Sequence, residues 1–292
     1  MSLSERFQTS LVAGVLVAGA FVAPSSVHAQ EAMYTEAATM PSPGVVTVRS
    51  LVHYSFYGRH PVTGVSDTRD LELGTSVQYG LARDWSLTID VPVMFRREVI
   101  PSETPGASSS VDHDQGVEDL DFTFKYRFYK HDTGGIDTVR AALLLGSETP
   151  SGDDEDFSSQ AFNPHVGGVV TVVRGRHGFN QDAHFQLNTG GDIDHNSGGD
   201  GPDDAIFHNT SYLFRISPER YTAETKGSWY ATIELSGIYE TNGDYELRYA
   251  PGIMYEAWTF ALEAMVQLPL YKDLDERYEL DLAVGFGVRF TF

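Results

Sequence analysis

The final stretch of the chain, residues 278–292, alternates between two kinds of side chain without a break. It reads YELDLAVGFGVRFTF, in which every even position is apolar or aromatic and every odd position is charged, small or hydroxylated. A period of two places the two kinds on opposite faces of a β-strand. The stretch is much longer than the ~5–6 residues typical of a strand in a globular sheet. It satisfies the ~9–11 residues that a tilted strand needs to cross a bilayer.

The chain ends on an aromatic residue, Phe292. An amphipathic strand that ends in this way resembles the C-terminal signal of bacterial outer-membrane β-barrel proteins. The resemblance implies an outer-membrane location in a Gram-negative bacterium and recognition of Phe292 by the barrel assembly machinery. It also implies that outer-membrane lipid and lipopolysaccharide surround the protein.

The first residues resemble a secretory signal peptide. Residues 11–22 form an apolar run of twelve, and Val27, His28 and Ala29 follow as a small-x-small cleavage site. The run is too short for a spanning helix, which needs ~20 residues. We therefore expect a signal peptide over residues 1–29 and a periplasmic N-terminal tail or plug-like segment over residues 30–43. The outer-membrane β-barrel is expected over residues 44–292. The absence of Cys excludes disulfides and thiolate metal sites.

The rest of the chain reads as a succession of strands. We predict about twelve, over residues 45–57, 69–81, 85–97, 118–130, 138–149, 162–174, 179–189, 205–216, 229–239, 245–255, 258–270 and 278–292. Short connections alternate with long polar ones such as 98–116 and 150–161, as in barrels with short periplasmic turns and longer external loops. Two connections fit this alternation less well. Residues 217–228 are long for a periplasmic turn, and residues 241–244 are short for an external loop. An even number of strands places both termini in the periplasm.

The predicted fold is all-β, a transmembrane antiparallel up-and-down β-barrel. A soluble β-sandwich or lipocalin-like barrel is the alternative, because it also alternates, but its apolar face points inward. Aromatic residues recur near the ends of the predicted strands, as at Trp85, Trp229, Tyr255 and Trp258. Such positions suit the aromatic girdles of a membrane barrel.

The polar faces of the predicted strands carry charges of both signs. A barrel of about twelve strands encloses a narrow lumen, so these residues either line a pore or fill the lumen with ion pairs. The candidates for lining the lumen are Arg49, Glu72, Asp90, Arg96, Asp121, Lys125, Arg127, Arg140, Glu234, Glu246, Arg248, Glu263, Glu279, Asp281 and Arg289. The formal net charge of -21 argues against nucleic acid as a partner. No nucleotide or cofactor fingerprint is present, and no cofactor is expected.

Residues 116–128 read GVEDLDFTFKYRF, and residues 141–152 read AALLLGSETPSG. They are followed by LEAMVQLPLY over 262–271 and FGVRF over 286–290. These elements and their order resemble a family of outer-membrane transporters named for the meta-pathway of phenol degradation, whose element is G-x-x-D-L-x-x-x-x-K-Y-R-F. The resemblance implies passive uptake or release of small molecules, among them hydrophobic or aromatic compounds. It brings no catalytic residues.

One loop pattern is similar to a calcium site. Asp192, Asp194 and Asn196 follow a D-x-D-x-N spacing, with Asp203 at the place of a last ligand. Alternating oxygen ligands suit a hard cation. The glycine comes one place late and the last ligand is not Glu, so a solvated acidic loop is the alternative interpretation.

An enzyme on a barrel is a second class of function. His195 and Ser197, with Asn209 further along, resemble the His/Ser/Asn arrangement of the outer-membrane phospholipase. A hydroxyl nucleophile needs a base and a group that orients the base, but the residues around Ser197 do not follow the phospholipase pattern. A structural or adhesive barrel with acidic external loops is a third class. We interpret the chain as a small-molecule channel or transporter rather than an enzyme.

Overall fold

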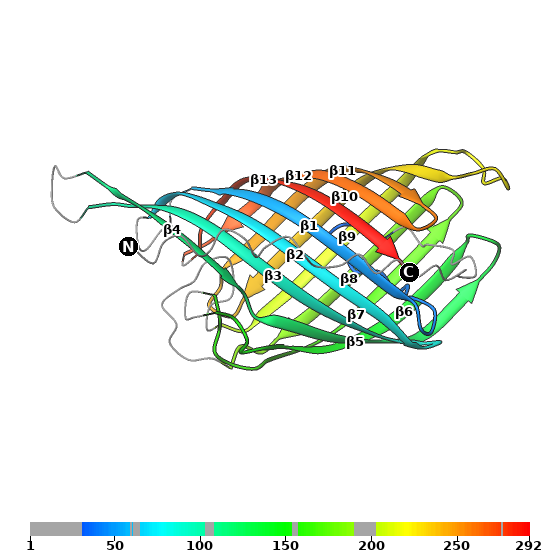
Figure 1. The fold of residues 1–292 in the computed structure, drawn as a ribbon, viewed down its shortest axis with the longest axis horizontal. Helices are drawn as coiled ribbons and strands as arrows, with labels where there is room; N and C mark the ends of the chain where they lie inside the picture. The colour runs from blue at the N-terminus through cyan, green and yellow to red at the C-terminus, as the bar shows by residue number, and fades with distance from the viewer. Residues whose placement is uncertain are drawn as a thin grey trace, which may run out of the picture.

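The computed structural model describes residues 31–58, 60, 65–102, 108–153, 157–189, 203–275 and 277–292. These residues form strands joined by turns and loops (Figure 1). The strands are β1 (Val46–Tyr57), β2 (Ser66–Ala82), β3 (Trp85–Ile100), β4 (Ser110–Val117), β5 (Leu120–Asp132), β6 (Thr138–Thr149), β7 (Asn163–Arg174), β8 (His177–Gln186), β9 (Ala205–Ser217), β10 (Gly227–Glu240), β11 (Tyr245–Ala257), β12 (Phe260–Asp273) and β13 (Leu280–Thr291). No helix in the described part of the chain is long and apolar enough to cross a membrane.

The strands form one closed antiparallel barrel. Every strand except β4 and β5 pairs with both of its neighbours in sequence, and β1 pairs with β13, where Val48 lies opposite Phe290. Strands β4 and β5 share β3 as a neighbour, because β5 pairs with its first half and β4 with its second half. The thirteen strands therefore occupy twelve positions around the barrel. The predicted up-and-down barrel of about twelve strands is confirmed.

Strand β4 corrects the predicted loop over residues 98–116. Strand β3 continues to Ile100 and pairs with β4, so that the two strands project as a hairpin beyond one end of the barrel (left in Figure 1). The break between β4 and β5 lies opposite Pro92, whose carbonyl accepts a hydrogen bond from Glu118 N at 3.1 Å. A residue's N–H and C=O point to the same neighbouring strand. Proline has no N–H to donate there, and such a position favours an interruption of the ladder.

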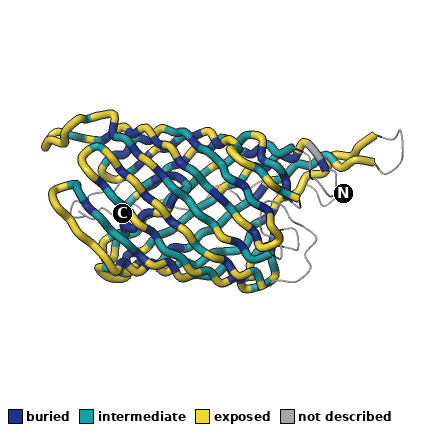
Figure 2. The backbone as a smooth tube through the Cα atoms, turned by 180° about the vertical axis from the view of Figure 1, so that it is seen from behind, coloured by how far each residue is buried: buried dark blue, intermediate teal, exposed yellow. Residues whose placement is uncertain are grey.

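The outer face of the barrel is apolar and the inner face is polar, as expected for a membrane barrel. Large apolar side chains are exposed on the outside, among them Trp85, Phe124 and Phe286. Lys125 and Arg289 are buried inside, and buried and exposed residues alternate along the strands (Figure 2). A lipocalin-like barrel has the opposite arrangement, with apolar side chains inside. Many large apolar side chains on the outward face mark it as a site of lipid or protein contact.

A bulge in β13 corrects the predicted faces of its first residues. Phe56 lies opposite Leu282 and Tyr57 opposite Leu280, so Asp281 is the extra residue. An inserted residue reverses the side-chain alternation beyond it. Leu280 is therefore buried although it was predicted on the apolar outer face, and Asp281 is exposed although it was predicted in the lumen. Glu279 likewise pairs with Lys272 at 2.7 Å in a partly exposed position.

Residues 31–39 lie inside the barrel rather than extending from it as a tail, whereas residues 42–44 are exposed. The segment enters at the end of the barrel that holds Phe292, which we call the Phe292 end; the opposite end is the loop end. At the entrance, Gly44 N donates to Gly80 O at 2.8 Å and Gly80 N donates to Val45 O at 3.0 Å. A Cβ at position 80 would lie 2.1 Å from the carbonyl oxygen of Ser42. Only glycine at this place in β2 allows the segment to pass.

Val284 lies on the outward face of β13, opposite Tyr54 of β1 and Val266 of β12. If this face meets lipid, Val284→Arg should lower the free energy of unfolding in bilayers by ~2–4 kcal/mol, because a charge near the membrane midplane loses its hydration. Val288→Arg, closer to the end of the strand, serves as the comparison and should cost less. Urea unfolding in vesicles measures both. A Val284→Arg variant as stable as the parent would exclude lipid contact at this position.

Candidate functional site

Residues 31–39, which we call the lumen segment, are anchored on one carboxylate of β10. Glu234 accepts hydrogen bonds from the backbone N–H groups of Met33, Tyr34 and Thr35 at 2.8, 3.0 and 2.8 Å. It also accepts one from the Thr35 hydroxyl at 2.9 Å. The Glu234 side chain is fully buried. Three consecutive N–H groups that converge on one carboxylate form charge-assisted hydrogen bonds, which are stronger than neutral ones.

The next residues of the lumen segment cross to strands on another side of the barrel. Glu36 N donates to Asp182 Oδ2 of β8 at 2.8 Å, and Ala38 N donates to Thr171 Oγ1 of β7 at 2.8 Å. Lys125 of β5 donates from Nζ to the carboxylate of Glu36 at 2.5 Å and to the carbonyl of Ala37 at 2.9 Å. Side chains of β5, β7, β8 and β10 thus hold one continuous segment across the lumen.

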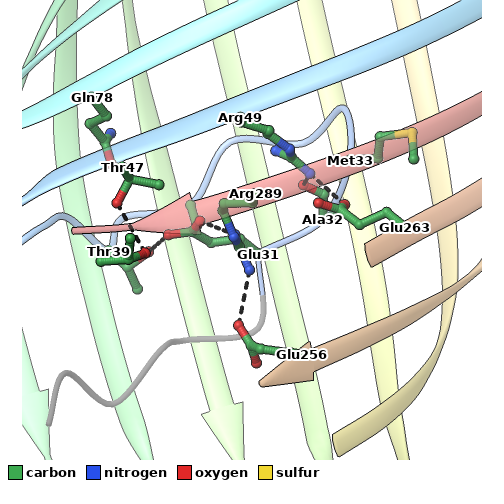
Figure 3. Close-up of polar contacts among 12 residues, drawn as sticks. Glu31, Ala32, Met33, Thr39, Thr47, Arg49, Gln78, Glu256, Glu263 and Arg289 are labelled. Carbon is green, nitrogen blue, oxygen red and sulfur yellow. Dashed lines mark hydrogen bonds and ion pairs between the residues drawn. The ribbon is translucent and has the colours of Figure 1, made fainter. Parts of the chain in front are cut away.

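An ion-pair cluster fixes the beginning of the lumen segment (Figure 3). Arg289 of β13 lies between Glu31, with which it pairs, and Glu256 of β11, whose Oε1 is 2.9 Å from Nη2. Arg49 of β1 donates from Nη2 to Glu263 Oε2 at 2.5 Å and to the carbonyl oxygen of Ala32 at 2.6 Å. Buried charges in a low-dielectric interior are tolerated when they are paired and hydrogen-bonded, and here the segment supplies partners for the arginines.

The apolar contacts inside the barrel also involve the lumen segment. Ala32 packs with Leu213, Tyr230 and Met254. Ala38 packs with Ala142, Leu144 and Val169, and Met33 packs with Ala250 and Met265. Each of these clusters joins one residue of the segment to inward-facing residues of the wall. Small side chains at positions 32 and 38 allow the backbone to approach the wall closely.

The candidates predicted to line the lumen have several different surroundings. Arg127 reaches Asp84 of the β2–β3 turn at 2.8 Å, at the Phe292 end. The carboxylate of Asp121 accepts a hydrogen bond from His165 Nε2 at 2.8 Å, and Asp90 is its cross-strand neighbour. Asp281 and Glu279 lie outside the lumen because of the bulge. Four inward-facing candidates contact the lumen segment, and a fifth, Glu263, pairs with one of them; the four are Arg49, Lys125, Glu234 and Arg289. Four others line the cavity described next, namely Glu72, Arg96, Glu246 and Arg248.

A cavity of about 490 Å³ lies between the lumen segment and the loop end. Met33 and Tyr34 of the segment line it on the side of the Phe292 end. Its wall comes from the loop-end halves of the strands, with His53, Arg96 and Arg248 among the lining residues. The lumen segment therefore separates this cavity from the Phe292 end of the barrel.

The loop between β6 and β7 closes part of the same cavity and is held by Asp119. Its carboxylate accepts hydrogen bonds from Ser151 N at 2.9 Å, Gly152 N at 2.8 Å and Ser159 N at 2.8 Å. The Ser159 hydroxyl donates a further bond at 2.7 Å. The loop carries Phe157 into the cavity wall, against Gly116, where a Cβ would lie 2.3 Å from Phe157 Cδ2.

These contacts join two motifs that lie apart in the sequence. Gly116 and Asp119 belong to the G-x-x-D-L element, and Ser151 and Gly152 end the AALLLGSETPSG element. The sequence showed both motifs but not their contact. Burial alone raises the pKa of the Asp119 carboxyl, but the hydrogen bonds from Ser159 and Gly152 outweigh it and lower the pKa below its usual value.

The sequence analysis did not predict the roles of Glu31, Glu36, Asp182 and Glu256. The two acidic residues of the lumen segment pair with Arg289 and Lys125, which the sequence already predicted to be inside. The sequence did contain one signal for this pairing, because a short segment with acidic residues precedes a barrel with inward-facing cations. The pairing itself depends on contacts between residues up to 258 positions apart.

The calcium-like and phospholipase-like patterns fall largely outside the described residues, which exclude Asp192, Asp194, His195, Asn196 and Ser197. Of the remaining two residues, Asp203 accepts a hydrogen bond at its carbonyl oxygen from Asn188 Nδ2 at 2.5 Å. Asn209 donates to Asp182 Oδ1 at 2.9 Å in the lumen. Within the described ranges, no three His, Asp or Glu side chains come together in a way that could hold a metal ion.

Comparison with known proteins supports the fold. No protein-family model matches this chain, and no curated protein matches it. Among solved structures, the chain is similar to an outer membrane channel from Pseudomonas putida F1, with 11% identity and a TM-score of 0.57 over 90% of this chain and 100% of that one. It is also similar to the beta domain of the Bordetella autotransporter BrkA, with 12% identity and a TM-score of 0.46 over 86% and 100%. The first likeness shows that the chain has the fold of an outer-membrane β-barrel.

Glu234→Ala should release the lumen segment from the wall. The substitution leaves three buried N–H groups without their acceptor, and each such group costs about 1–3 kcal/mol. We expect backbone amide exchange of Met33, Tyr34 and Thr35 to become at least tenfold faster, measured by hydrogen exchange and mass spectrometry. Glu279→Gln, which removes a carboxylate far from the segment, is the control. Unchanged protection in Glu234→Ala would contradict the anchoring role.

Acid should loosen the loop that Asp119 holds. Because the folded pKa lies below that of an unfolded Asp, about 3.9, the stabilisation is complete above that value and is lost as the pH falls through the folded pKa. Exchange protection at Gly152 and Ser159, corrected for intrinsic rates, should stay constant at neutral pH and decrease below about pH 4. Asp119→Asn should show low protection at every pH, whereas Asp137→Asn should behave like the parent. Protection that is independent of pH in the parent would exclude this mechanism.

Proposed function

We propose that this chain is an outer-membrane channel for small molecules, in which the lumen segment restricts passage. The observation that carries the proposal is the combination of an apolar outer surface with a charged interior that holds both a cavity and an inserted segment. An apolar outside suits lipid, and a polar inside suits water and solute. Neighbouring molecules on this proposal are outer-membrane lipid and lipopolysaccharide, with Phe292 recognised during assembly.

The lumen segment defines how such a channel would work. Ion pairs hold Glu31 and Glu36, and hydrogen bonds to Glu234 hold residues 33–35 between them. The segment is joined covalently to the wall through residues 40–45, which lead into β1. A solute that enters from the loop end meets the cavity first and the segment second. It then passes either beside the segment or after the segment has moved. Movement down a concentration gradient needs no energy source, so we propose passive diffusion.

The proposed solutes are small, and hydrophobic or aromatic compounds are among them. The support is the resemblance of the motifs over residues 116–128 and 141–152 to the meta-pathway transporters, together with the contact that Asp119 makes between the two motifs. Aliphatic and aromatic residues also line the cavity, including Met94 and Phe157. We also propose that residues 1–29 are a signal peptide and that residues 44–292 form the barrel.

Planar-bilayer recording tests the channel directly. We expect the parent protein to give small steady conductance steps, and a variant that lacks residues 31–43 to give steps several-fold larger, because removal of the segment opens the lumen. Heat-modifiability on gels and unchanged β-sheet circular dichroism establish that both barrels are folded. If both folded proteins are silent, the channel proposal is wrong. If both conduct equally, the segment does not restrict passage.

A further inference from the structure

The cavity beside the lumen segment has an excess of negative charge. Its lining contains six carboxylate side chains and two guanidinium groups. The carboxylates are Asp70, Glu72, Glu118, Asp119, Glu148 and Glu246, and the guanidinium groups are Arg96 and Arg248. A concave site with low-dielectric walls concentrates the field of such an imbalance and attracts counter-ions of the opposite sign.

Both guanidinium groups already have carboxylate partners. Arg96 forms two parallel hydrogen bonds to Asp70, from Nε to Oδ1 at 3.0 Å and from Nη2 to Oδ2 at 2.9 Å. Arg248 donates from Nη2 to Glu246 Oε2 at 2.6 Å. A bidentate arginine–carboxylate pair leaves little positive charge for a third group. The positive charges of the two arginines are therefore already matched by Asp70 and Glu246.

Two buried acceptors of neighbouring strands have no partner among the described residues. The second carboxylate oxygen of Glu246, Oε1, makes no hydrogen bond, and neither does Oε1 of Gln267. The two residues are 1% and 3% exposed. The hydroxyl of Tyr34, on the lumen segment, is also buried without a partner. A buried carboxylate oxygen is best satisfied by a charged N–H donor.

One buried donor of the lining, Arg248 Nε, also has no partner among the described residues. The charge of its guanidinium group, however, is already balanced by Glu246. His53 Nε2 and the Ser236 hydroxyl are likewise buried without partners and can either donate or accept. Glu246 Oε1 and Gln267 Oε1 therefore lack a donor, and a lining with six carboxylates and two guanidinium groups favours a donor that carries positive charge.

The rest of the cavity is suited to an apolar body. Met33, Leu51, Met94, Phe157 and Ile238 line it. Tyr34 and Tyr57 add aromatic rings, whose faces attract cations. A volume of about 490 Å³ lies within the ~300–1,000 Å³ of sites that enclose small organic molecules.

We propose that this cavity is a binding site for an organic cation, an ammonium group attached to an aromatic or aliphatic body, with Glu246 and Gln267 as the polar contacts. The inference rests on the proposed function, because it names the class of solute that would pause in the channel. It requires only equilibrium binding, which is measured separately from flux.

Three probes with the same aromatic body test the charge preference. Phenethylammonium, phenethyl alcohol and phenylacetate carry positive, zero and negative charge at neutral pH. Each is titrated calorimetrically into the folded full-length protein in detergent, and the heat of titration into protein-free micelles is subtracted. We expect phenethylammonium to bind at least tenfold more tightly than the alcohol and phenylacetate to show no binding. Equal affinities, or tighter binding of phenylacetate, would overturn the proposal.

Variants place the binding in this cavity. Glu246→Gln should weaken phenethylammonium binding at least fivefold, because it removes the charge and keeps the shape. Glu72→Gln, from β2 on another part of the wall, gives an independent test if Glu246→Gln does not fold. Glu279→Gln removes the same charge from a residue that does not line the cavity, and binding should be unchanged. Parent-like affinity in both folded cavity variants would overturn the assignment.

The two proposals can fail separately. Cation binding by a folded protein that gives no conductance would support the site and contradict the channel. Conductance without preference for phenethylammonium would support the channel and contradict the site.

Discussion

The pairing of β1 with β13 is the interaction on which the rest of the structure depends. Eleven residue pairs join the two strands, from Thr47 and Thr291 to Tyr57 and Leu280. Without this pairing, both strands would present a row of unpaired N–H and C=O groups, which is untenable against hydrocarbon. Closure also separates the faces, because every strand must then turn one set of side chains outward and the other set into a narrow lumen.

A lumen of this kind collects charges that need partners. Arg49, Lys125 and Arg289 project from three different strands into the lumen, and carboxylates of the wall pair with only two of them, Arg49 and Arg289. The lumen segment supplies Glu31 and Glu36, as well as backbone carbonyls. In return, the wall supplies Glu234 for the N–H groups of the segment. The barrel and the segment are therefore complementary in charge, and the same contacts that stabilise the segment narrow the proposed channel.

Two elements that are independent of each other form the boundaries of the cavity. The lumen segment forms one boundary with Tyr34, and the loop between β6 and β7 forms another with Phe157. Asp119 holds that loop from the interruption between β4 and β5, opposite Pro92. An interruption in the wall, which weakens the ladder locally, thus frees a carboxylate to organise a loop. This arrangement gives the proposed solute site a wall that a regular strand could not provide.

The sequence by itself determined the fold class and most of the inward-facing charges. Strand parity is a local property, so residues such as Glu234, Arg248 and Arg289 could be assigned to one face from their neighbours alone. Local pattern could not reveal the bulge at Asp281, which depends on the register with β1, or the pairing of β4 with β3. It also left open whether the lumen was plugged. The contact of Glu234 with residues 33–35 spans about 200 positions, and only closure of the barrel brings such distant residues together.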